Sequence, residues 1–182
     1  MIDFTKNYFD LFGLPVDYVL DVGELGMRYR DLQAVVHPDR YANASDQEQR
    51  LALQQATQVN EAYETLRDPL RRAIYMLRLH GVDTSQETAT TRDTGFLMQQ
   101  MELREELENV RNQPDPYAAV LDICNHVNKQ ITSLVGQMAV QFETPTADQL
   151  DAAREILRKM RFLKKLRSEA ESVAAALEDE MH

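Results

Sequence analysis

Apolar residues recur at intervals of three and four positions along much of this 182-residue chain, and prolines separate the stretches. Such spacing places the apolar side chains on one face of an α-helix. Pro38 disfavours helix in the residue before it, so the first long helix is expected to end at His37, and Asp68-Pro69 ends the second. The two stripes consist of Leu25, Tyr29, Leu32 and Val36, and of Ala52, Ala56, Val59, Tyr63 and Leu66. Two such helices joined by a short loop are expected to pack as an antiparallel pair.

The tripeptide His37-Pro38-Asp39 lies on the connection between these helices, and Arg40 follows it. Proline fixes its own φ angle, so the loop displays an imidazole and a carboxylate in a shape that is largely set before any partner arrives. His-Pro and Pro-Asp pairs also occur as plain helix ends, so the tripeptide alone does not establish a function. With two flanking helices, the pattern favours a recognition loop.

The second half of the chain starts after a polar segment, residues 81–94, that contains a single large apolar residue. Such a segment cannot bury enough surface to form an element of its own, so it is expected to be a linker. Three helical patterns follow, and they predict a three-helix bundle over residues 95–182. Asp115-Pro116 is a typical start for the second helix, and Thr146 with Gln149 resembles a capping box for the third. The fold class expected for the whole chain is therefore all-α.

The first helix of the predicted bundle has two apolar faces. At about 100° per residue, one sector holds Phe96, Leu103, Leu107 and Val110, and an almost opposite sector holds Leu97, Met98 and Met101. A helix at the edge of a bundle buries one face, so the second is exposed unless another part of the chain or a partner covers it. Methionine suits an adaptable binding surface because it is unbranched and polarizable. Both interpretations of this face stay open from periodicity alone.

Composition excludes several function classes. The net charge is −10 and both halves carry more acidic than basic side chains, which argues against nucleic-acid binding. No run of eighteen apolar residues occurs and the first twelve residues do not resemble a signal peptide, so we expect a cytoplasmic protein without membrane contact. Cys124 is the only cysteine, it lies on a core stripe, and it is expected to be a buried small hydrophobe. No metal or cofactor is expected.

Catalytic chemistry gains little support from the residues. Cys124 and His126 point to different sides of a helix, and no third group accompanies His37 and Asp39. We therefore expect no enzyme activity. A basic stripe on the last helix consists of Arg154, Arg158, Arg161 and Lys165. It is expected to be a solvated face or to pair with Glu102, Glu105, Glu106 and Glu108, while phosphate binding and contact with an acidic partner stay open.

Several motifs of the first 80 residues resemble, in order and spacing, a J-domain of the DnaJ type. They are Tyr8-Phe9-Asp10-Leu11-Phe12-Gly13-Leu14-Pro15, Tyr29-Arg30-Asp31-Leu32, His37-Pro38-Asp39-Arg40 and Asn60-Glu61-Ala62-Tyr63-Glu64-Thr65-Leu66. Further motifs in the second half resemble the HscB family, the J-proteins of iron–sulfur cluster assembly. They are Arg92-Asp93-Thr94, Phe96-Leu97-Met98, Glu102-Leu103-Arg104-Glu105-Glu106-Leu107 and Arg158-Lys159-Met160-Arg161-Phe162-Leu163.

This resemblance implies a co-chaperone with a J-domain at residues 1–80, a linker at 81–94 and a scaffold-binding bundle at 95–182. It would stimulate the ATPase of the DnaK-type chaperone HscA and bring it the iron–sulfur scaffold protein IscU. The residues implied in chaperone binding are His37, Pro38, Asp39, Arg28, Arg30 and Arg40, and those implied in scaffold binding are Leu97, Met98, Met101 and Phe162. A J-protein serving another chaperone and client, or a helical adaptor, are the alternatives.

One departure from the J-domain pattern concerns charge. J-domains usually carry more basic residues just before the tripeptide and a lysine after it. Here Ala34, Val35 and Val36 precede His37, and Arg40 stands in the place of the lysine. Positive charge is therefore kept after the loop and reduced before it.

Overall fold

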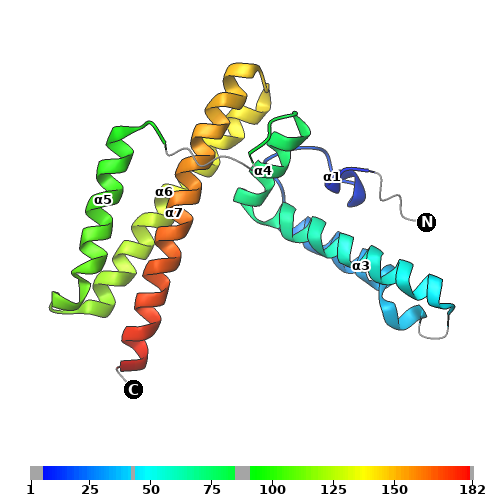
Figure 1. The fold of residues 1–182 in the computed structure, drawn as a ribbon, viewed down its shortest axis with the longest axis horizontal. Coiled ribbons are helices and arrows are strands. Elements are labelled where there is room, and N and C mark those ends of the chain that lie inside the picture. Colours follow the sequence, from blue (N-terminus) through cyan, green and yellow to red (C-terminus); the bar gives the residue numbers. More distant parts are fainter. Residues whose placement is uncertain (1–5, 42–43, 85–90, 181–182) are drawn as a thin grey trace. The chain divides into compact units, whose positions relative to one another are not determined.

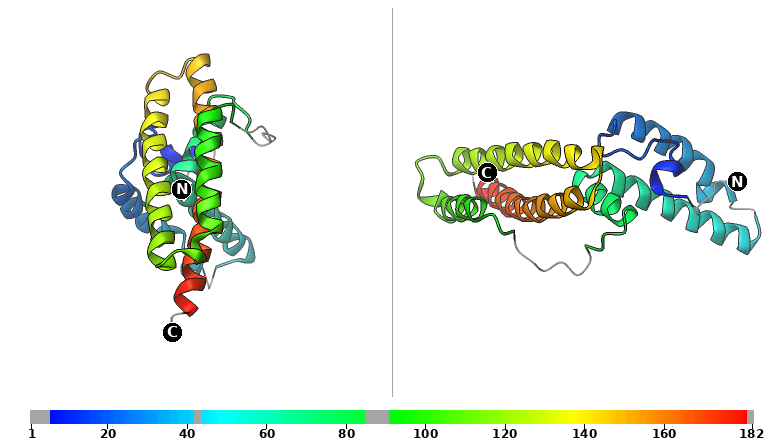
Figure 2. Two further views of the ribbon diagram at one scale, coloured as in Figure 1. Left: turned by 90° about the vertical axis from the view of Figure 1, so that its left-hand side faces the viewer. Right: turned by 90° about the horizontal axis from the view of Figure 1, so that it is seen from above.

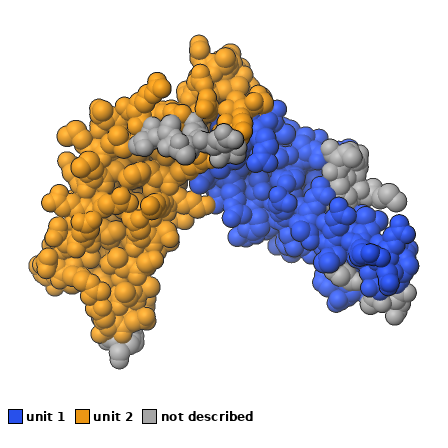
Figure 3. All heavy atoms as spheres, in the orientation of Figure 1, with its two compact units in different colours: residues 1–79 blue, residues 80–182 orange. Residues whose placement is uncertain are grey.

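The structure is a computed structural model that describes residues 6–41, 44–84 and 91–180. It divides into two compact units, residues 1–79 and 80–182 (Figure 3). Every regular element in the described part of the chain is helical, which confirms the all-α prediction. We describe each unit by itself.

The first unit is built around an antiparallel helix pair, as predicted (Figure 1). Asp21 caps the first helix of the pair by accepting hydrogen bonds from the amides of Gly23 and Glu24. Ser45 and Glu48 form a full capping box at the start of the second. The elements are α1 (Tyr8–Leu11), α2 (Val22–Val36), the short 3₁₀ helix η1 (Pro38–Tyr41), α3 (Asp46–Arg67) and α4 (Pro69–Leu79).

The core of this unit lies between α2 and α3, with α1 and α4 closing one end. Leu25 and Val36 of the predicted stripe are buried, while Tyr29 stacks on Tyr63 with ring centroids 4.0 Å apart. At the α3–α4 corner a charged side chain, Arg72, is almost fully buried. Its guanidinium donates to the carbonyl of Leu66 at 2.7 Å, and this hydrogen bond offsets part of the cost of burying the charge.

The second unit is a three-helix bundle in which α6 and α7 form the most extensive contact (Figure 2). Asp115 caps α6 by accepting from the amide of Ala118 at 3.0 Å, and Thr146 with Gln149 forms the predicted capping interaction before α7. The elements are α5 (Thr94–Glu108), the 3₁₀ helix η2 (Val110–Asn112), α6 (Pro116–Glu143) and α7 (Ala147–Glu180).

The segment predicted as a linker, 81–94, is anchored on α7 at both of its described ends. The side chain of Arg161 donates to the carbonyl of Thr84 at 3.3 Å, and the hydroxyl of Thr91 donates to the carboxylate of Glu155. Both threonines are buried. Residues 85–90 of the predicted linker lie outside the described residues. The ends of this segment are therefore held by hydrogen bonds rather than by an apolar face, which is why hydrophobic periodicity did not indicate any packing.

Candidate binding sites on the two helical units

The tripeptide forms an exposed corner between α2 and α3. His37 is the C-cap of α2, and Pro38 opens η1. The amide of Asp39 donates to Nδ1 of His37 at 3.3 Å, and Oδ2 of Asp39 lies 3.6 Å from the same nitrogen. The side chains of His37 and Asp39 are 52% and 91% exposed. The loop thus presents an imidazole and a carboxylate to solvent in a locally closed turn.

The three arginines predicted to contribute to this loop's binding surface make different contacts in the structure. Arg40 donates through Nη1 to the carbonyl of Ala34 at 2.9 Å, in the last turn of α2. Arg28 donates to the carbonyls of Phe12 and Gly13 at 2.9 and 3.1 Å, and its guanidinium also pairs with Glu24 at 2.7 Å. Two of the three guanidinium groups are therefore engaged within the unit.

Arg30 differs from the other two arginines. Its side chain is exposed and makes no ion pair or side-chain hydrogen bond with the described residues. Asp31, directly after it, is also exposed. Arg30 is thus the cation of the predicted set whose charge faces solvent without an internal partner.

The second apolar face of α5 is exposed in the bundle. Met98 and Met101 are 64% and 72% exposed, and Leu97 is half-buried. Leu103 and Leu107, on the opposite face, are buried as predicted. Within the second unit no described segment covers the two methionines, so the bundle itself does not bury this face.

Phe162 of α7 is brought against α5 by two contacts that the sequence analysis missed. Its ring meets Phe96 edge to face, with centroids 6.1 Å apart and planes at 79°. The guanidinium of Arg104 lies over its face, 5.5 Å from the centroid, and is held by Glu169 at 2.9 Å. Arg104 and Glu169 come from different helices, so no local pattern indicated this pair. The arrangement fixes the orientation of a half-buried aromatic ring beside α5.

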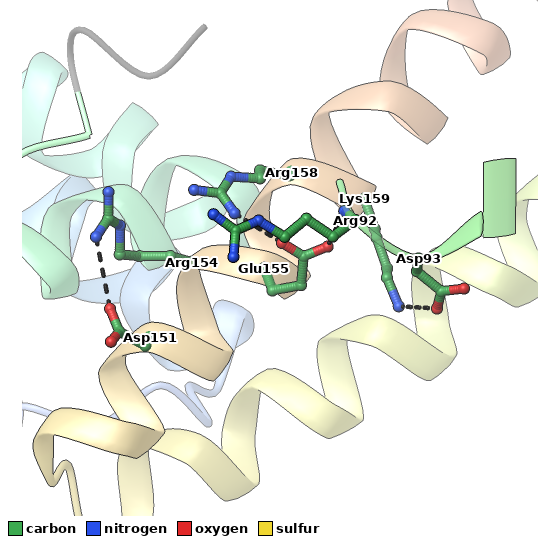
Figure 4. A pocket seen from close by; sticks show the side chains of 7 residues that line it. All are labelled: Arg92, Asp93, Asp151, Arg154, Glu155, Arg158 and Lys159. Atoms are coloured by element: carbon green, nitrogen blue, oxygen red, sulfur yellow. Dashed lines mark hydrogen bonds and ion pairs between the residues drawn. The ribbon is translucent and has the colours of Figure 1, made fainter. Parts of the chain in front are cut away.

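Two members of the basic stripe of α7, Arg154 and Arg158, pair with acids other than those predicted. Arg158 pairs with Glu155 at 2.7 Å and Arg154 with Asp151 at 3.5 Å, while Lys159, which is not part of the predicted stripe, pairs with Asp93 at 2.7 Å (Figure 4). These groups, with Arg92, line a cavity of about 550 Å³. The predicted pairing with Glu102, Glu105, Glu106 and Glu108 is not observed in the described residues. Arg154 and Arg158 pair along their own helix because acids three residues earlier are already within reach.

Charge pairing in this cavity lowers the pKa values of two carboxyl groups, those of Asp93 and Glu155. A hydrogen bond from Lys159 lowers the pKa of Asp93, helped by the amide of Phe96. Burial opposes the ionisation of Glu155, but hydrogen bonds from Thr91 and Arg158 outweigh it, and the pKa of Glu155 is lowered. Both carboxylates are thus charged at neutral pH, which leaves the cavity with four cations against three anions.

The structure was also searched for clusters of metal-binding side chains. Among the described residues no group of three or more histidine, cysteine, aspartate or glutamate side chains is arranged to hold a metal ion. Cys124 is half-buried rather than fully buried, because it sits beside the line of Val120, Ile123 and Val127 that faces the core. Burial raises the pKa of its thiol. In the described part of the chain no helix is long and apolar enough to span a membrane.

Comparison with known proteins adds two family matches, one for each unit. Residues 7–75 match the DnaJ domain, and residues 92–171 match the HSCB C-terminal oligomerisation domain. Curated relatives include the co-chaperone protein HscB homologs of Shewanella amazonensis and Shewanella loihica. The first is 44% identical over 176 residues, covering 95% of this chain and 99% of the relative. The second is 43% identical over 171 residues, covering 94% and 99%.

Solved structures show the same likeness. The chaperone HscB from Vibrio cholerae superposes with a TM-score of 0.83 at 42% sequence identity, covering 94% of this chain and 99% of the other. The human co-chaperone protein HscB superposes with a TM-score of 0.81 at 32% identity, covering 93% and 82%.

Proposed function

Because the chain belongs to the HscB family of J-domain co-chaperones, we propose that it stimulates ATP hydrolysis by the DnaK-type chaperone HscA and brings the iron–sulfur scaffold protein IscU to it. In this role it supports the maturation of iron–sulfur proteins in the cytoplasm. It contributes binding energy alone and no chemistry of its own. The observation that carries the proposal is the presence of two exposed surfaces on separate units, one a stiff polar loop and the other an apolar helix face.

The chaperone is proposed to bind the first unit at His37, Pro38 and Asp39, and at Arg30, about two helical turns earlier on α2. A loop whose shape is set in advance loses little conformational entropy on binding. It accelerates hydrolysis by binding the hydrolysis-competent state of the ATPase more tightly than the other state, because only differential binding shifts such an equilibrium. Arg40 supports this surface through its bond to the carbonyl of Ala34, and Arg28, nine residues before His37 on α2, is held by the carbonyl of Phe12.

The scaffold protein is proposed to bind the second unit at Leu97, Met98, Met101 and Phe162. The two methionines supply the exposed apolar area, and Phe162 supplies an aromatic edge whose orientation is fixed by Phe96 and Arg104. Exposed apolar side chains of this kind stabilise a complex when the partner removes them from water.

Steady-state ATPase assays with purified HscA test the first half of the proposal. His37→Gln removes the titratable ring but keeps a polar side chain, and it is expected to abolish stimulation without loss of helicity. His126→Gln, an exposed histidine of α6, is the matched control and is expected to stimulate normally. Full stimulation by the His37 variant would refute the assignment.

Calorimetric titration of IscU into the full chain tests the second half. Alanine at Leu97, Met98 and Met101 together is expected to weaken binding by about 100-fold or more, as the loss of a central apolar cluster usually does. Alanine at Leu121 and Val140, which are exposed apolar residues of α6, provides the control. Unchanged affinity in the triple variant would show that the scaffold binds elsewhere.

A further inference from the structure

Apolar burial alone does not decide which face of α5 lies against the bundle. The first apolar face consists of Phe96, Leu103 and Leu107, and the second of Leu97, Met98 and Met101. Each face has three large apolar side chains, so burying either one removes a similar area from water. Some other feature of the helix has to keep the second face exposed.

A buried glutamine, Gln100, lies on the border between the two faces. At about 100° per residue, it falls between Phe96 on the first face and Leu97 on the second. Gln100 has no exposed surface, and its Nε2 donates to Oε1 of Gln130 on α6 at 2.9 Å. Within the described residues this is the hydrogen bond between side chains that joins α5 to α6.

The contacts of Gln100 are not those that stability alone would favour. Its Oε1 is buried and accepts no hydrogen bond from the described residues. A buried acceptor without a partner destabilises a fold, and a single hydrogen bond through Nε2 offsets only part of that cost. An apolar side chain of similar size would avoid the cost. A buried polar residue does, however, restrict a helix to the packing arrangement that satisfies it, as buried asparagine does in coiled coils.

We propose that Gln100 is a positioning residue for scaffold binding, because its hydrogen bond to Gln130 selects the rotation of α5 in which the second apolar face points to solvent. The inference rests on the proposed function and deepens it by naming what keeps the scaffold-binding face outward. Gln130 belongs to α6 and does not turn with α5. A rotation of α5 that buried the second face would therefore carry the Gln100 amide away from its acceptor and leave it unpaired.

The other polar contacts of α5 do not replace this bond. Arg104 pairs with Glu169 of α7 at 2.9 Å, and both side chains are 38% exposed. Lys159 pairs with Asp93, which precedes the first turn of α5. Partly exposed ion pairs contribute little, and their long side chains can follow a turning helix. The buried amide pair is thus the contact that depends on the rotation of α5, and the fraction of molecules in the correct rotation sets the apparent affinity for the scaffold.

The first test compares affinity with stability. Gln100→Leu introduces an apolar, helix-favouring side chain of similar size and removes the hydrogen bond. Calorimetric titration of IscU into the full chain is expected to show an affinity about three- to tenfold lower, the usual effect of losing one hydrogen bond. The melting temperature is expected to equal that of the wild type or to rise. Gln99→Leu is the matched control with wild-type affinity, because Gln99 is exposed on the same helix and makes no side-chain hydrogen bond with the described residues.

A second measurement reports on the exposure of the second apolar face. Met98 and Met101 are exposed, so dilute hydrogen peroxide is expected to convert both to sulfoxides quickly in the wild type. In Gln100→Leu the rate of Met101 oxidation, followed by mass spectrometry, is expected to fall by about twofold or more, because a fraction of the molecules buries this side chain. General loosening of the bundle would instead speed the oxidation of the buried Met138 and Met160.

Variants at Gln130 test whether the bond itself is responsible. Gln130→Leu is expected to lose as much affinity as Gln100→Leu, and the double variant no more than either, because each change removes the same interaction. Gln130→Glu keeps an acceptor for the Gln100 amide, so its affinity is expected to stay within about twofold of the wild type.

The outcomes separate this inference from the proposed function. Unchanged affinity in the alanine variant of Leu97, Met98 and Met101 would refute the proposed scaffold site and this inference with it. If that variant binds weakly, unchanged affinity in Gln100→Leu would refute the positioning role alone. A loss of affinity accompanied by a lower melting temperature and faster oxidation of Met138 would assign Gln100 to the stability of the bundle, and the inference would be wrong.

Discussion

The corner at His37 and the second apolar face of α5, with Met98 and Met101, differ in how firmly their exposed groups are held. At the corner the backbone is fixed by proline, and short local bonds join Asp39 to His37 and Arg40 to Ala34. On α5 the exposed groups are Met98 and Met101, which carry flexible side chains without internal partners among the described residues. A stiff polar site discriminates by geometry, whereas a methionine surface adapts to the shape that it meets. The two sites should therefore respond differently to conservative substitution.

The largest expected effect of a conservative change is at the corner. Asp39→Asn preserves shape but removes the negative charge from a side chain that is 91% exposed. If the corner is read by geometry and charge, stimulation of the ATPase is expected to fall by at least about tenfold, the cost of one charge-assisted hydrogen bond. Steady-state ATPase assays check this, and Asp122→Asn, at an exposed aspartate of α6 in the other unit, is the control. Normal stimulation by Asp39→Asn would remove the contrast between the sites.

A smaller effect is expected from conservative changes on α5. Leucine in place of both Met98 and Met101 conserves volume and apolar character, and such exchanges usually cost little. Affinity for IscU measured by calorimetry is expected to change by less than about threefold, which corresponds to well under 1 kcal/mol. A loss comparable with that of the alanine variants would mean that this surface is shaped as strictly as the corner.

Phe162 is the rigid part of the otherwise adaptable surface, and its support can be tested separately. Arg104→Met removes the cation above the ring and the pair with Glu169. Cation–π contacts at half-exposed sites contribute about 0.5–1 kcal/mol, so IscU affinity is expected to fall by about two- to fivefold. Arg104→Lys should restore most of it because the cation is kept. Lack of rescue by lysine, with the same loss in Phe162→Leu, would show that bulk rather than orientation matters.

The helices and both surfaces were predictable from local sequence, but the contacts that fix them were not. Periodicity identified α2, α3 and the two-faced α5, and the stop at Pro38 followed from proline's own geometry. Arg28 reaches carbonyls fifteen and sixteen residues earlier in the chain. Arg104 meets Glu169 sixty-five residues away. Such pairs depend on how helices pack, and hydrophobic spacing contains no information about which polar side chains then meet.

The burial of single residues on α6 and α7 was harder to predict for a related reason. Cys124 and Phe162 lie beside the centre of their apolar stripes, where a small change in helix rotation decides between full and partial burial. Because Phe162 lies at the edge of its apolar stripe, its ring is only half-buried and can still contact a partner. Residues at the edge of a stripe are therefore the ones whose role needs the three-dimensional structure.

The smallest expected effect concerns the start of α5, where Asp93 caps the helix and also pairs with Lys159 of α7. The lowered pKa of Asp93 means that its contribution to stability is present above the pKa of the unfolded aspartate, about 3.9, and is lost as pH falls through the lower folded value. Asp93→Asn keeps the cap but removes the ion pair. Its melting temperature is expected to lie slightly below that of the wild type at neutral pH, and the difference should shrink as the pH falls below about 3.9 and vanish below the folded pKa.

Asp115→Asn is the matched control for this last experiment, because Asp115 caps α6 through the amide of Ala118 and forms no ion pair among the described residues. Its melting temperature should follow the wild type across this pH range. Since Asp93 lies next to the turn that carries Phe96 and Leu97, a loosened start of α5 would also disturb the second apolar face. Measuring the IscU affinity of Asp93→Asn shows whether the start of α5 is loosened enough to disturb this face. An unchanged affinity would show that Phe162 keeps its orientation without the Asp93–Lys159 pair, and a several-fold loss would show that this surface depends on the anchoring of the start of α5 on α7.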